Sequence, residues 1–497
     1  MRHLLLFLGI CSSAFAHVGS PDVFYEGNAG PYHVLVTIRP PAVIPGVAEI
    51  EVRCNSNDVT QVRIVPLPLR GPGAKFAPTP DVAQRSKDDP EFYTGSLWMM
   101  GFGSWQVRVH VDGGKGQGET SIPVPALATR STTMDKSLGM LLAGLCLFLM
   151  IGIVSIVGAG VREAQLDPGA IPGETNRRRS RIVMAVSLVA VAAVGYLGNQ
   201  WWNSEAHHYA RRVYKPIQMT GTVESGRRLV LHLEDTGFFR FNKLDDLVPD
   251  HGHLMHLFVV SDPAMDRMWH LHPEQAEPGS FTLDLPAIPA GKYRLFADIV
   301  HASGIPETGA TVMEIPAVEP GKPLSGDDSA AAGSPVSQAD LNRTEAPLSG
   351  GYRMVWQRDA AALKAKRAYL FHFRVEDQNG RPAENVELYM GMPGHAEFVG
   401  NDFQVFAHVH PSGSAPMAAF GILQAASKPD SKPGAVNVAR EVPSMGDMQG
   451  MQAMPAVAMP PEVSFPYGFP KPGNYRMFVQ VKRAGKVETG IFDTRVE

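Results

Sequence analysis

The sequence predicts a mainly β protein, made of several Ig-like β-sandwich domains and a two-helix transmembrane hairpin. Three observations lead to this fold class. Short strand-like runs alternate with Gly and Pro clusters, two long apolar segments carry no charge, and one histidine-containing pattern occurs twice in the second half of the chain. At 497 residues the chain exceeds the size of one compact core, so we expect several modules.

Residues 1–16 have the organisation of a secretory signal peptide. A basic start precedes the apolar run 4–10, and the small-x-small sequence 14–16 follows as a cleavage site. Cleavage there would make His17 the mature N-terminus. A lipoprotein signal at Cys11 is the alternative, which the bulky residue before that cysteine disfavours. The leader therefore predicts export of the region that follows it.

Residues 17–130 predict an N-terminal Ig-like β-sandwich. Runs such as 32–38 and 105–111 are rich in β-branched and aromatic residues, and turn signals separate them at regular intervals. Cys54 is the single thiol of the exported part, because Cys11 lies in the leader and Cys146 in an apolar segment. No internal disulfide is expected, and the core must stabilise the fold.

Two segments, 138–161 and 182–202, are each long enough and apolar enough to cross a membrane as a helix. The loop 162–181 between them contains five arginines, which predicts that it is cytoplasmic. Two buried core helices are the alternative, but core helices seldom run uncharged for this length. We thus expect an inner-membrane protein with its soluble domains on the periplasmic, extracytoplasmic side.

After the hairpin, the sequence predicts two related β-sandwich modules, 213–318 and 351–497, joined by a Pro, Gly, Ser and Ala-rich linker, 319–350. Each module contains a histidine followed by a His-x-His-Pro sequence, and the spacing differs by one residue between the copies. Each then has a Gly-x-Tyr-Arg strand, at 291–294 and at 473–476. The repeated histidines are His256, His270 and His272 in the first copy and His395, His408 and His410 in the second.

The repeated histidines are candidate metal ligands. Side chains two apart on a strand share one face, so each His-x-His pair can chelate an ion. We expect His256 to lie beside its His-x-His strand through a turn at 261–267, with the side chains lining an exposed site. His251 and His253 lie five and three residues before His256 in the first copy. Met390 and Met392 lie at the same offsets before His395 in the second copy.

These ligand types indicate copper, with zinc as the other candidate. Imidazole suits copper(II) and zinc, and thioether sulfur prefers copper(I), so the second copy has the softer donors. The alternative is structural: His-x-His pairs on polar strand faces and methionines that fill the core. The occurrence of two copies with similar spacing favours the metal interpretation.

Two further groups of candidate ligands lie outside the repeat. The second module contains an insertion of about 44 residues, whose methionines are separated by polar and small residues that give no apolar periodicity. Its alternative is a disordered low-complexity insert. The α-amine and imidazole of His17 would form a bidentate copper chelate, to which His33 or His110 could add an imidazole. The methionines are Met445, Met448, Met451 and Met454.

The segments 92–97 and 103–109 resemble the end of YtkA-like and FixH-like domains, in which a strand, a short turn and a Gly-x-Trp strand close an Ig-like sandwich. The resemblance covers about residues 20–125 and implies copper handling or oxidase maturation. Residues 65–69 depart from the family, which often has a Met-Pro-rich stretch there. The C-terminal modules resemble periplasmic copper-binding proteins, and the sequence 392–395 has a related appearance.

The formal net charge of −4 gives no broad basic field, so nucleic acid is not an expected partner. No motif for nucleophilic catalysis or phosphate binding stands out. We therefore expect a copper carrier, chaperone or resistance factor that is not an enzyme, with a copper transporter or oxidase assembly complex as its partner. The alternatives are a scaffolding or adhesive β-sandwich protein without metal, and a copper oxidase that uses a histidine brace at His17.

Overall fold

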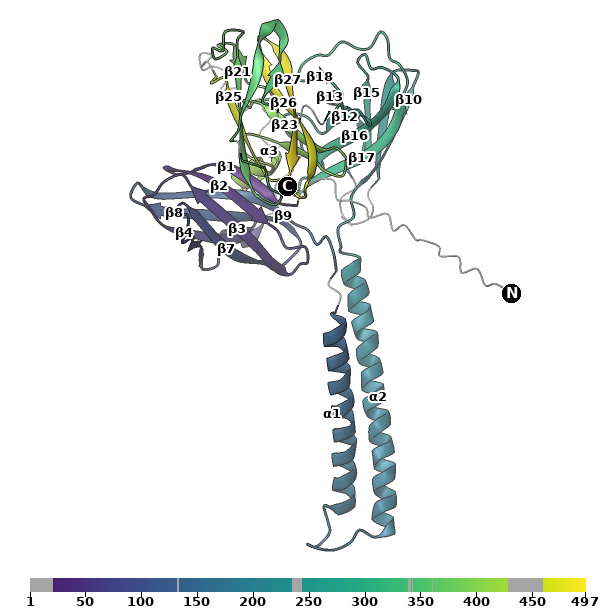
Figure 1. Cartoon of the computed structure of the whole chain (residues 1–497). Helices are drawn as coiled ribbons and strands as arrows, with labels where there is room; N and C mark the ends of the chain where they lie inside the picture. The colour runs from purple at the N-terminus through teal and green to yellow at the C-terminus, as the bar shows by residue number, and fades with distance from the viewer. Residues whose placement is uncertain are drawn as a thin grey trace, which may run out of the picture. The chain divides into compact units, whose positions relative to one another are not determined.

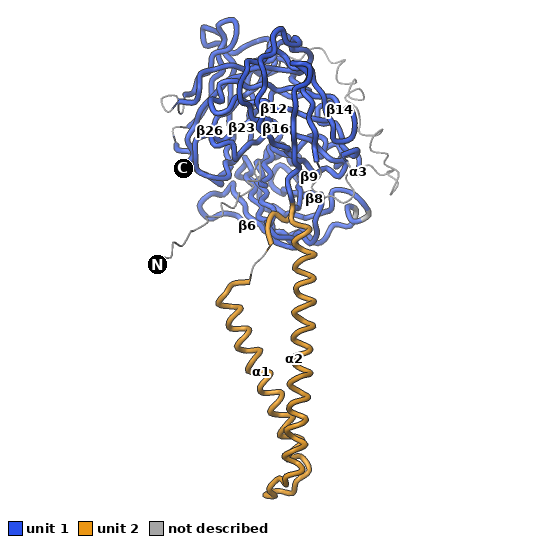
Figure 2. The backbone as a smooth tube through the Cα atoms, turned by 90° about the vertical axis from the view of Figure 1, so that its right-hand side faces the viewer, with its two compact units in different colours: residues 1–127, 215–497 blue, residues 128–214 orange. Residues whose placement is uncertain are grey.

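The computed structural model describes residues 21–131, 134–234, 244–337, 341, 343–359, 361–427 and 459–497. The predicted signal peptide 1–16 lies outside the described residues, as do His17 and the four methionines of the insertion, Met445, Met448, Met451 and Met454. The chain forms two compact units, which Figure 2 distinguishes by colour: residues 1–127 with 215–497, and residues 128–214.

The N-terminal domain is a β-sandwich, as predicted. One sheet has the order β1 (Val23–Ala29), β2 (Tyr32–Arg39), β3 (Gly46–Cys54), β7 (Phe92–Met99) and β6 (Gln84–Arg85). The other has the order β5 (Asp81–Val82), β4 (Val59–Pro68), β8 (Gly103–Gly113) and β9 (Gly116–Ala126), with the short helix η1 (Pro72–Lys75) after β4. Alternate side chains such as Val34 and Val36 are fully buried between the sheets. The sheets are the purple and blue strands in Figure 1.

The second unit consists of helices α1 (Lys136–Glu163) and α2 (Glu174–Ala210), which contain the two predicted spans and are long and apolar enough to cross a membrane. Asp135 caps α1 by accepting hydrogen bonds from two backbone N–H groups of its first turn. The helices contact each other where Ser180 donates a hydrogen bond to the carbonyl of Gly158, at 2.7 Å. Residues 174–181, expected in the loop, form the first turns of α2.

The first C-terminal module is built on a nine-stranded sheet around a core of aliphatic and aromatic side chains. The interval 319–350, which we expected to be a linker, contributes the edge strand of this sheet, because the strand at 329–332 pairs with the strand of His270. The order of the strands is β14 (Glu274–Glu277), β15 (Ser280–Asp284), β11 (Arg228–Glu234), β10 (Gln218–Glu224), β17 (Pro306–Ile315), β16 (Gly291–Val300), β12 (His256–Ser261), β13 (Arg267–Leu271) and β18 (Ser329–Ala332).

The second C-terminal module has two sheets that enclose a core rich in Phe and Tyr. One sheet has the order β19 (Glu345–Pro347), β20 (Arg353–Gln357), β21 (Tyr369–Glu376) and β25 (Glu462–Tyr467). The other has the order β22 (Val386–Glu387), β26 (Gly473–Arg483), β23 (His395–Gly400) and β24 (Phe406–Val409), with β27 (Lys486–Val496) on β26. Helix η3 (Ser349–Gly351) precedes β20, and α3 (Met417–Ser427) follows β24.

The two modules repeat one another in strand register as well as in sequence. His256 on β12 lies opposite Asp298 on β16, and His395 on β23 lies opposite Gln480 on β26. In each copy the tyrosine of the Gly-x-Tyr-Arg strand donates a hydrogen bond to the carbonyl four residues earlier, at 2.8 Å in the first and 2.7 Å in the second. The repeat predicted from the sequence is therefore a structural repeat.

An aromatic cluster packs the two modules against each other. Phe296 of β16 stacks on Phe406 of β24, with ring centroids 4.3 Å apart, and Phe258 of β12 lies 5.1 Å from Phe406. Phe478 of β26 belongs to the same buried cluster. This packing places the β12–β13 hairpin beside the β23–β24 hairpin, so the two His-x-His pairs face one interface.

Candidate metal centre

The β12–β13 hairpin positions the histidines of the first module. Phe258 pairs with His270 in the register, and the residues between Ser261 and Arg267 make the turn, as predicted. The imidazole rings of His256 and His270 lie 5.3 Å apart by their centroids. The expected proximity of the first histidine to its His-x-His strand is confirmed.

The hydrogen bonds of His256 and His270 determine which ring nitrogens carry a proton. His256 Nε2 lies 3.0 Å from the backbone oxygen of Asp250, and His270 Nδ1 lies 2.9 Å from Gln480 Oε1. Both oxygens can only accept hydrogen bonds, so the ring nitrogens that face them, His256 Nε2 and His270 Nδ1, must donate. We call these the outer nitrogens. In a neutral imidazole the other ring nitrogen then has a lone pair. The two lone-pair nitrogens, His256 Nδ1 and His270 Nε2, are 3.0 Å apart.

His272 follows the same pattern. Its Nδ1 lies 3.0 Å from the Asp328 carboxylate, so it donates, and its Nε2 is buried with no partner among the described residues. One ligand atom from each of His256, His270 and His272 lies within 4.8 Å of the others. Outer nitrogens that donate and inner lone pairs that converge are the arrangement by which proteins orient imidazoles toward a metal. We call these three residues the first histidine group.

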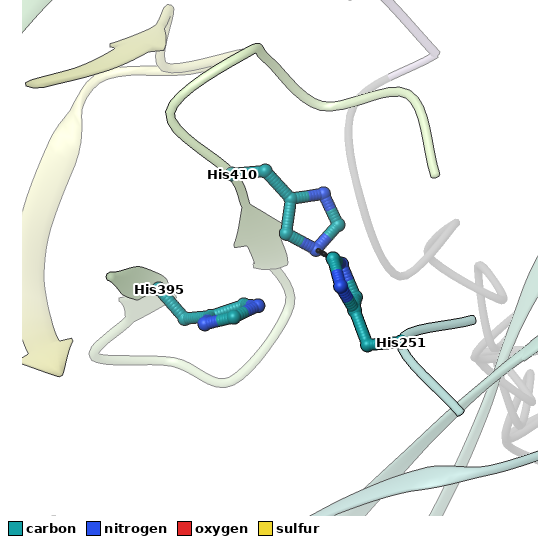
Figure 3. A group of neighbouring side chains, drawn as sticks. All are labelled: His251, His395 and His410. Carbon is teal, nitrogen blue, oxygen red and sulfur yellow. Dashed lines mark hydrogen bonds between the residues drawn. The ribbon is translucent and has the colours of Figure 1, made fainter. Parts of the chain in front are cut away.

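The second histidine group takes residues from both modules: His251, His395 and His410 (Figure 3). His251 Nε2 and His410 Nε2 are 3.2 Å apart, and all three ligand atoms lie within 4.8 Å of one another. His251 Nδ1 donates to the carbonyl of Met390, at 3.0 Å, so its Nε2 has the lone pair. Both ring nitrogens of His395 are buried without a partner among the described residues.

His251 lies in a tight turn that has an equivalent in the other module. Asp250 and His253 exchange backbone hydrogen bonds around His251 and Gly252, and both central residues have positive φ, 50° and 88°. Tyr389 and Met392 do the same around Met390 and Gly391, with φ of 51° and 80°. The structure thus gives His251 a place in the second module's site, a connection that sequence offsets within one copy do not reveal. Met390 and Met392 are both buried.

His408 lies between the two groups. Its ring centroid is 5.5 Å from that of His256 and 5.4 Å from that of His395. Its Nδ1 is 3.4 Å from Asp298 of the first module, and its Nε2 is buried without a partner among the described residues. His253 stacks on His272 with ring centroids 3.8 Å apart. All eight histidines predicted from the repeat therefore belong to one cluster.

Burial lowers the pKa of six of these histidines. Removal from water disfavours the charged ring, and neighbouring histidines add repulsion, so the pKa values of His256, His270, His395 and His410 fall well below the usual range. The pKa values of His251 and His272 are also lowered, chiefly by burial. At neutral pH these six rings are uncharged and offer lone pairs.

The expectation of an exposed site was wrong. His270 and His395 have no exposed surface, and His256 and His410 have 2% each. The physical reason is the packing of one module on the other, which covers the histidine faces of both hairpins. His253, with 30% of its side chain exposed and its Nε2 3.4 Å from Asp327, is the more accessible member.

Sequence reasoning missed three polar residues of this interface. The side-chain oxygen of Gln480 accepts a hydrogen bond from His270 Nδ1. The Tyr389 hydroxyl donates to the backbone oxygen of Asp327, at 2.7 Å, and lies 3.3 Å from His270 Nδ1. Glu397 is fully buried, and neither carboxylate oxygen has a partner among the described residues; burial first, and Asp298 second, raise its pKa well above the usual range. Aligning the two copies would have revealed Glu397, which occupies the position of Phe258.

The other proposed imidazoles have ordinary partners. His33 on β2 lies 3.2 Å from Glu26, and His110 on β8 lies 3.1 Å from Glu119. Both contacts are within the N-terminal sandwich. Ligation by these residues together with His17 stays a prediction, because His17 is not among the described residues.

Comparison with known proteins gives a family match, and the solved structures that match do so with low TM-scores. The model of a family described as "Domain of unknown function (DUF8832)" matches residues 215–316 and 346–497, the two modules that form the histidine cluster. No curated protein matches the chain.

Three of the solved structures that are similar to the chain illustrate how low their sequence identity to it is. The first is an engineered protein, with 12% identity, coverage of 18% of this chain and 20% of that one, and a TM-score of 0.15. The second is a tetra-tandem repeat in the extending region of a large adhesion protein, with 8% identity, coverage of 91% of this chain and 71% of that one, and a TM-score of 0.16. The third is the ICAM-5 D1–D4 ectodomain fragment, with 6% identity, coverage of 94% of this chain and 77% of that one, and a TM-score of 0.16. The chain thus spans a fifth of the length of the engineered protein. At these TM-scores the similarities carry no argument about function.

Proposed function

We propose that this chain, which belongs to the family described as "Domain of unknown function (DUF8832)", is a membrane-anchored protein that binds a transition metal, copper in preference to zinc, between its two C-terminal modules. The role is to hold or pass on the ion, as a carrier, chaperone or resistance factor, rather than to catalyse a reaction. The observation that carries the proposal is the first histidine group.

The lone pairs of His256 Nδ1 and His270 Nε2 face each other at 3.0 Å, and each outer nitrogen is committed to an acceptor. Two lone pairs at this distance repel each other, so without a cation between them the arrangement is unfavourable. A tetrahedral metal with bonds of about 2.0–2.1 Å to nitrogen separates two ligand atoms by about 3.3 Å. The geometry therefore supports an ion that accepts both lone pairs and that of His272.

Copper is preferred because the sequence of the second module contains thioether donors as well as imidazoles. Imidazole alone suits zinc and copper, and thioethers select copper(I). Met390 and Met392 occupy the turn equivalent to that of His251 and His253, and the insertion 444–454 adds four methionines in the same module.

The membrane anchor and the compartment belong to the same proposal. Helices α1 and α2 are long and apolar enough to span a membrane. The arginines of the segment 162–181 favour a cytoplasmic position for that segment, which would place both soluble parts on the outer side. An extracytoplasmic site meets incoming copper before it reaches the cytoplasm.

The test is metal retention by the full chain purified in detergent. The protein is equilibrated with copper(I) under anaerobic conditions or with zinc, separated from free metal by gel filtration, and analysed for metal content. The variant replaces His256, His270 and His272 with Ala, and the control is His372→Ala, an exposed strand histidine that bonds to Ser464. We expect the variant to lose at least one equivalent of metal and the control to lose none.

Failure of the wild-type chain to retain either metal would overturn the proposal and leave the scaffolding alternative. Equal metal content in the triple variant and the wild type would also overturn it, because the ion would then be held elsewhere. A preference for zinc over copper(I) in competition would keep the site and correct the metal.

A further inference from the structure

The module interface contains more donor atoms than one ion can use. The first and second histidine groups share no residue, yet each brings three ligand atoms within 4.8 Å. Their rings are close: His251 lies 6.0 Å from His256, and His270 lies 6.4 Å from His395, by ring centroids. A transition metal in a protein takes four to six donors, and six histidines plus His408 exceed that number.

We propose that the cluster is a centre for two cations, one in each histidine group, and that Glu397 supplies the anionic ligand of the second. The inference rests on the proposed function, because it assumes that the first group binds metal. It goes further by naming the number of ions and a ligand outside the repeated histidines.

Glu397 is placed for this role by the strand geometry. It lies on β23 two residues after His395, so the two side chains point to the same face of the strand. It lies directly opposite His408 on β24 in the antiparallel register. Neither of its oxygens has a hydrogen-bond partner among the described residues, although the side chain is fully buried. A buried carboxyl with no partner is unfavourable unless a cation binds there.

The charge balance of the two groups supports the same role. In the first group, Asp328 binds His272, and Asp327 lies 3.4 Å from the neighbouring His253, so carboxylates already compensate an ion there. Phe258 occupies the position equivalent to Glu397 in that module. In the second module, the carboxylate of Glu397 occupies that position, two residues after His395. An ion bound by neutral imidazoles alone would be a buried, uncompensated charge.

His408 links the two ions. Its unpartnered Nε2 is buried, and its ring lies 5.8 Å from His270 and 4.6 Å from His410 by centroids, so it faces residues of both groups. Asp298, on the first module, holds the opposite ring nitrogen at 3.4 Å. This histidine is the fourth donor available to either position, and it makes the two sites one centre.

The experiment is a titration of the full chain in detergent with cobalt(II), followed by its visible absorption and by metal analysis after gel filtration. Cobalt(II) reports nitrogen and oxygen ligation and has little affinity for thioethers, so the methionine-rich insertion does not interfere. We expect two bound ions in the wild type. We expect one ion when His256 and His272 are replaced with Ala, one when His395 and His410 are replaced, and two in His372→Ala.

Two variants test Glu397. Glu397→Gln keeps the shape and removes the charge, and Glu397→Met fills the space without a polar group. We expect both to retain the first ion and to weaken the second at least tenfold. Glu397→Met should also melt at the same or a higher temperature without metal, because it removes an unpartnered buried carboxyl. A purely structural role would give the opposite sign in that melt.

The outcomes separate the inference from the proposed function. Wild-type binding of one ion that depends on His256 and His272 would overturn the two-ion centre and keep the metal site. Two ions with unchanged affinity in Glu397→Met would overturn the role of Glu397. Absence of any bound cobalt, copper or zinc would overturn both proposals.

Discussion

Replacing His270 and His272 with Ala in the full chain should abolish most of the metal-dependent stabilisation contributed by the first histidine group. The stabilisation that a bound ion gives depends on its concentration relative to its Kd. An ion present at about 100 times its Kd stabilises the folded state by about 2.7 kcal/mol. With roughly 2–4 °C per kcal/mol, the wild-type melting temperature should rise by about 5–10 °C for one group. The variant should keep only the increase due to the second group.

The metal-free cost of the same change follows from burial. His270 has no exposed surface, and its removal leaves Gln480 Oε1 without its donor, which costs roughly 1–3 kcal/mol. Loss of the facing lone pairs of His256 and His270 offsets part of this cost. We therefore expect the metal-free variant to melt a few degrees below the wild type, with a loss of metal response larger than the loss of stability.

The assay is a pair of melts in detergent, with and without zinc or copper, followed by circular dichroism or intrinsic fluorescence. His372→Ala is the matched control, because it removes a strand imidazole that bonds only to Ser464 at the surface in the described structure. A wild-type melting temperature that excess metal does not move would refute the reasoning. So would a double variant whose response to metal equals that of the wild type.

Three other predictions concern the rest of the chain. A reporter fused after Arg179 should be active only in the cytoplasm and one fused after Gly351 only outside it; an external signal from the first would contradict the topology. Deleting residues 444–454 should weaken copper(I) binding at least several-fold with an unchanged melting curve, since long loops add little closure entropy; unchanged affinity would reduce the segment to a spacer. Burial alone would lower the pKa of His301, but hydrogen bonds to Asp246 and Glu307 raise it to about 9. Its charged form therefore stabilises the fold fully below pH 6.5 and progressively less as the pH rises to 9. The substitution His301→Gln should lower the free energy of unfolding by on the order of 3 kcal/mol near pH 6 and by little above pH 9. A difference in melting temperature that stays constant across this range would refute the charge assignment.

The sequence predicted the local parts of the site because they depend on local patterns. The repeat identified His256 and the His-x-His pairs, and the period of a strand placed each pair on one face. The hairpin register then follows from the length of the turn. The mainly β fold and the two apolar helices were accessible for the same reason, because hydrophobic periodicity and segment length decide them.

The interface between the modules was not predictable in this way. Phe258, Phe296 and Phe406 have the pattern of ordinary core residues, and nothing in their spacing distinguishes the core of one module from its contact with another. That contact buries the histidines and brings His251 to His395. The strand β18 was missed because Ser329–Ala332 has weak strand propensity; pairing with β13 selects its conformation.

Several of the differences between the two copies lie at the cluster, and their chemistry favours a metal centre over a purely structural interface. The tyrosine hydrogen bonds, the tight turns and the strand registers are kept, so both modules retain the frame that positions side chains. Packing alone gives no reason to exchange a phenyl group for an unpartnered carboxyl at a buried position, because that exchange is unfavourable without a cation. Two ion sites with different donor sets do give a reason. The aligned pairs at the cluster that differ in chemical type are His251 and Met390, His253 and Met392, Phe258 and Glu397, and Asp298 and Gln480.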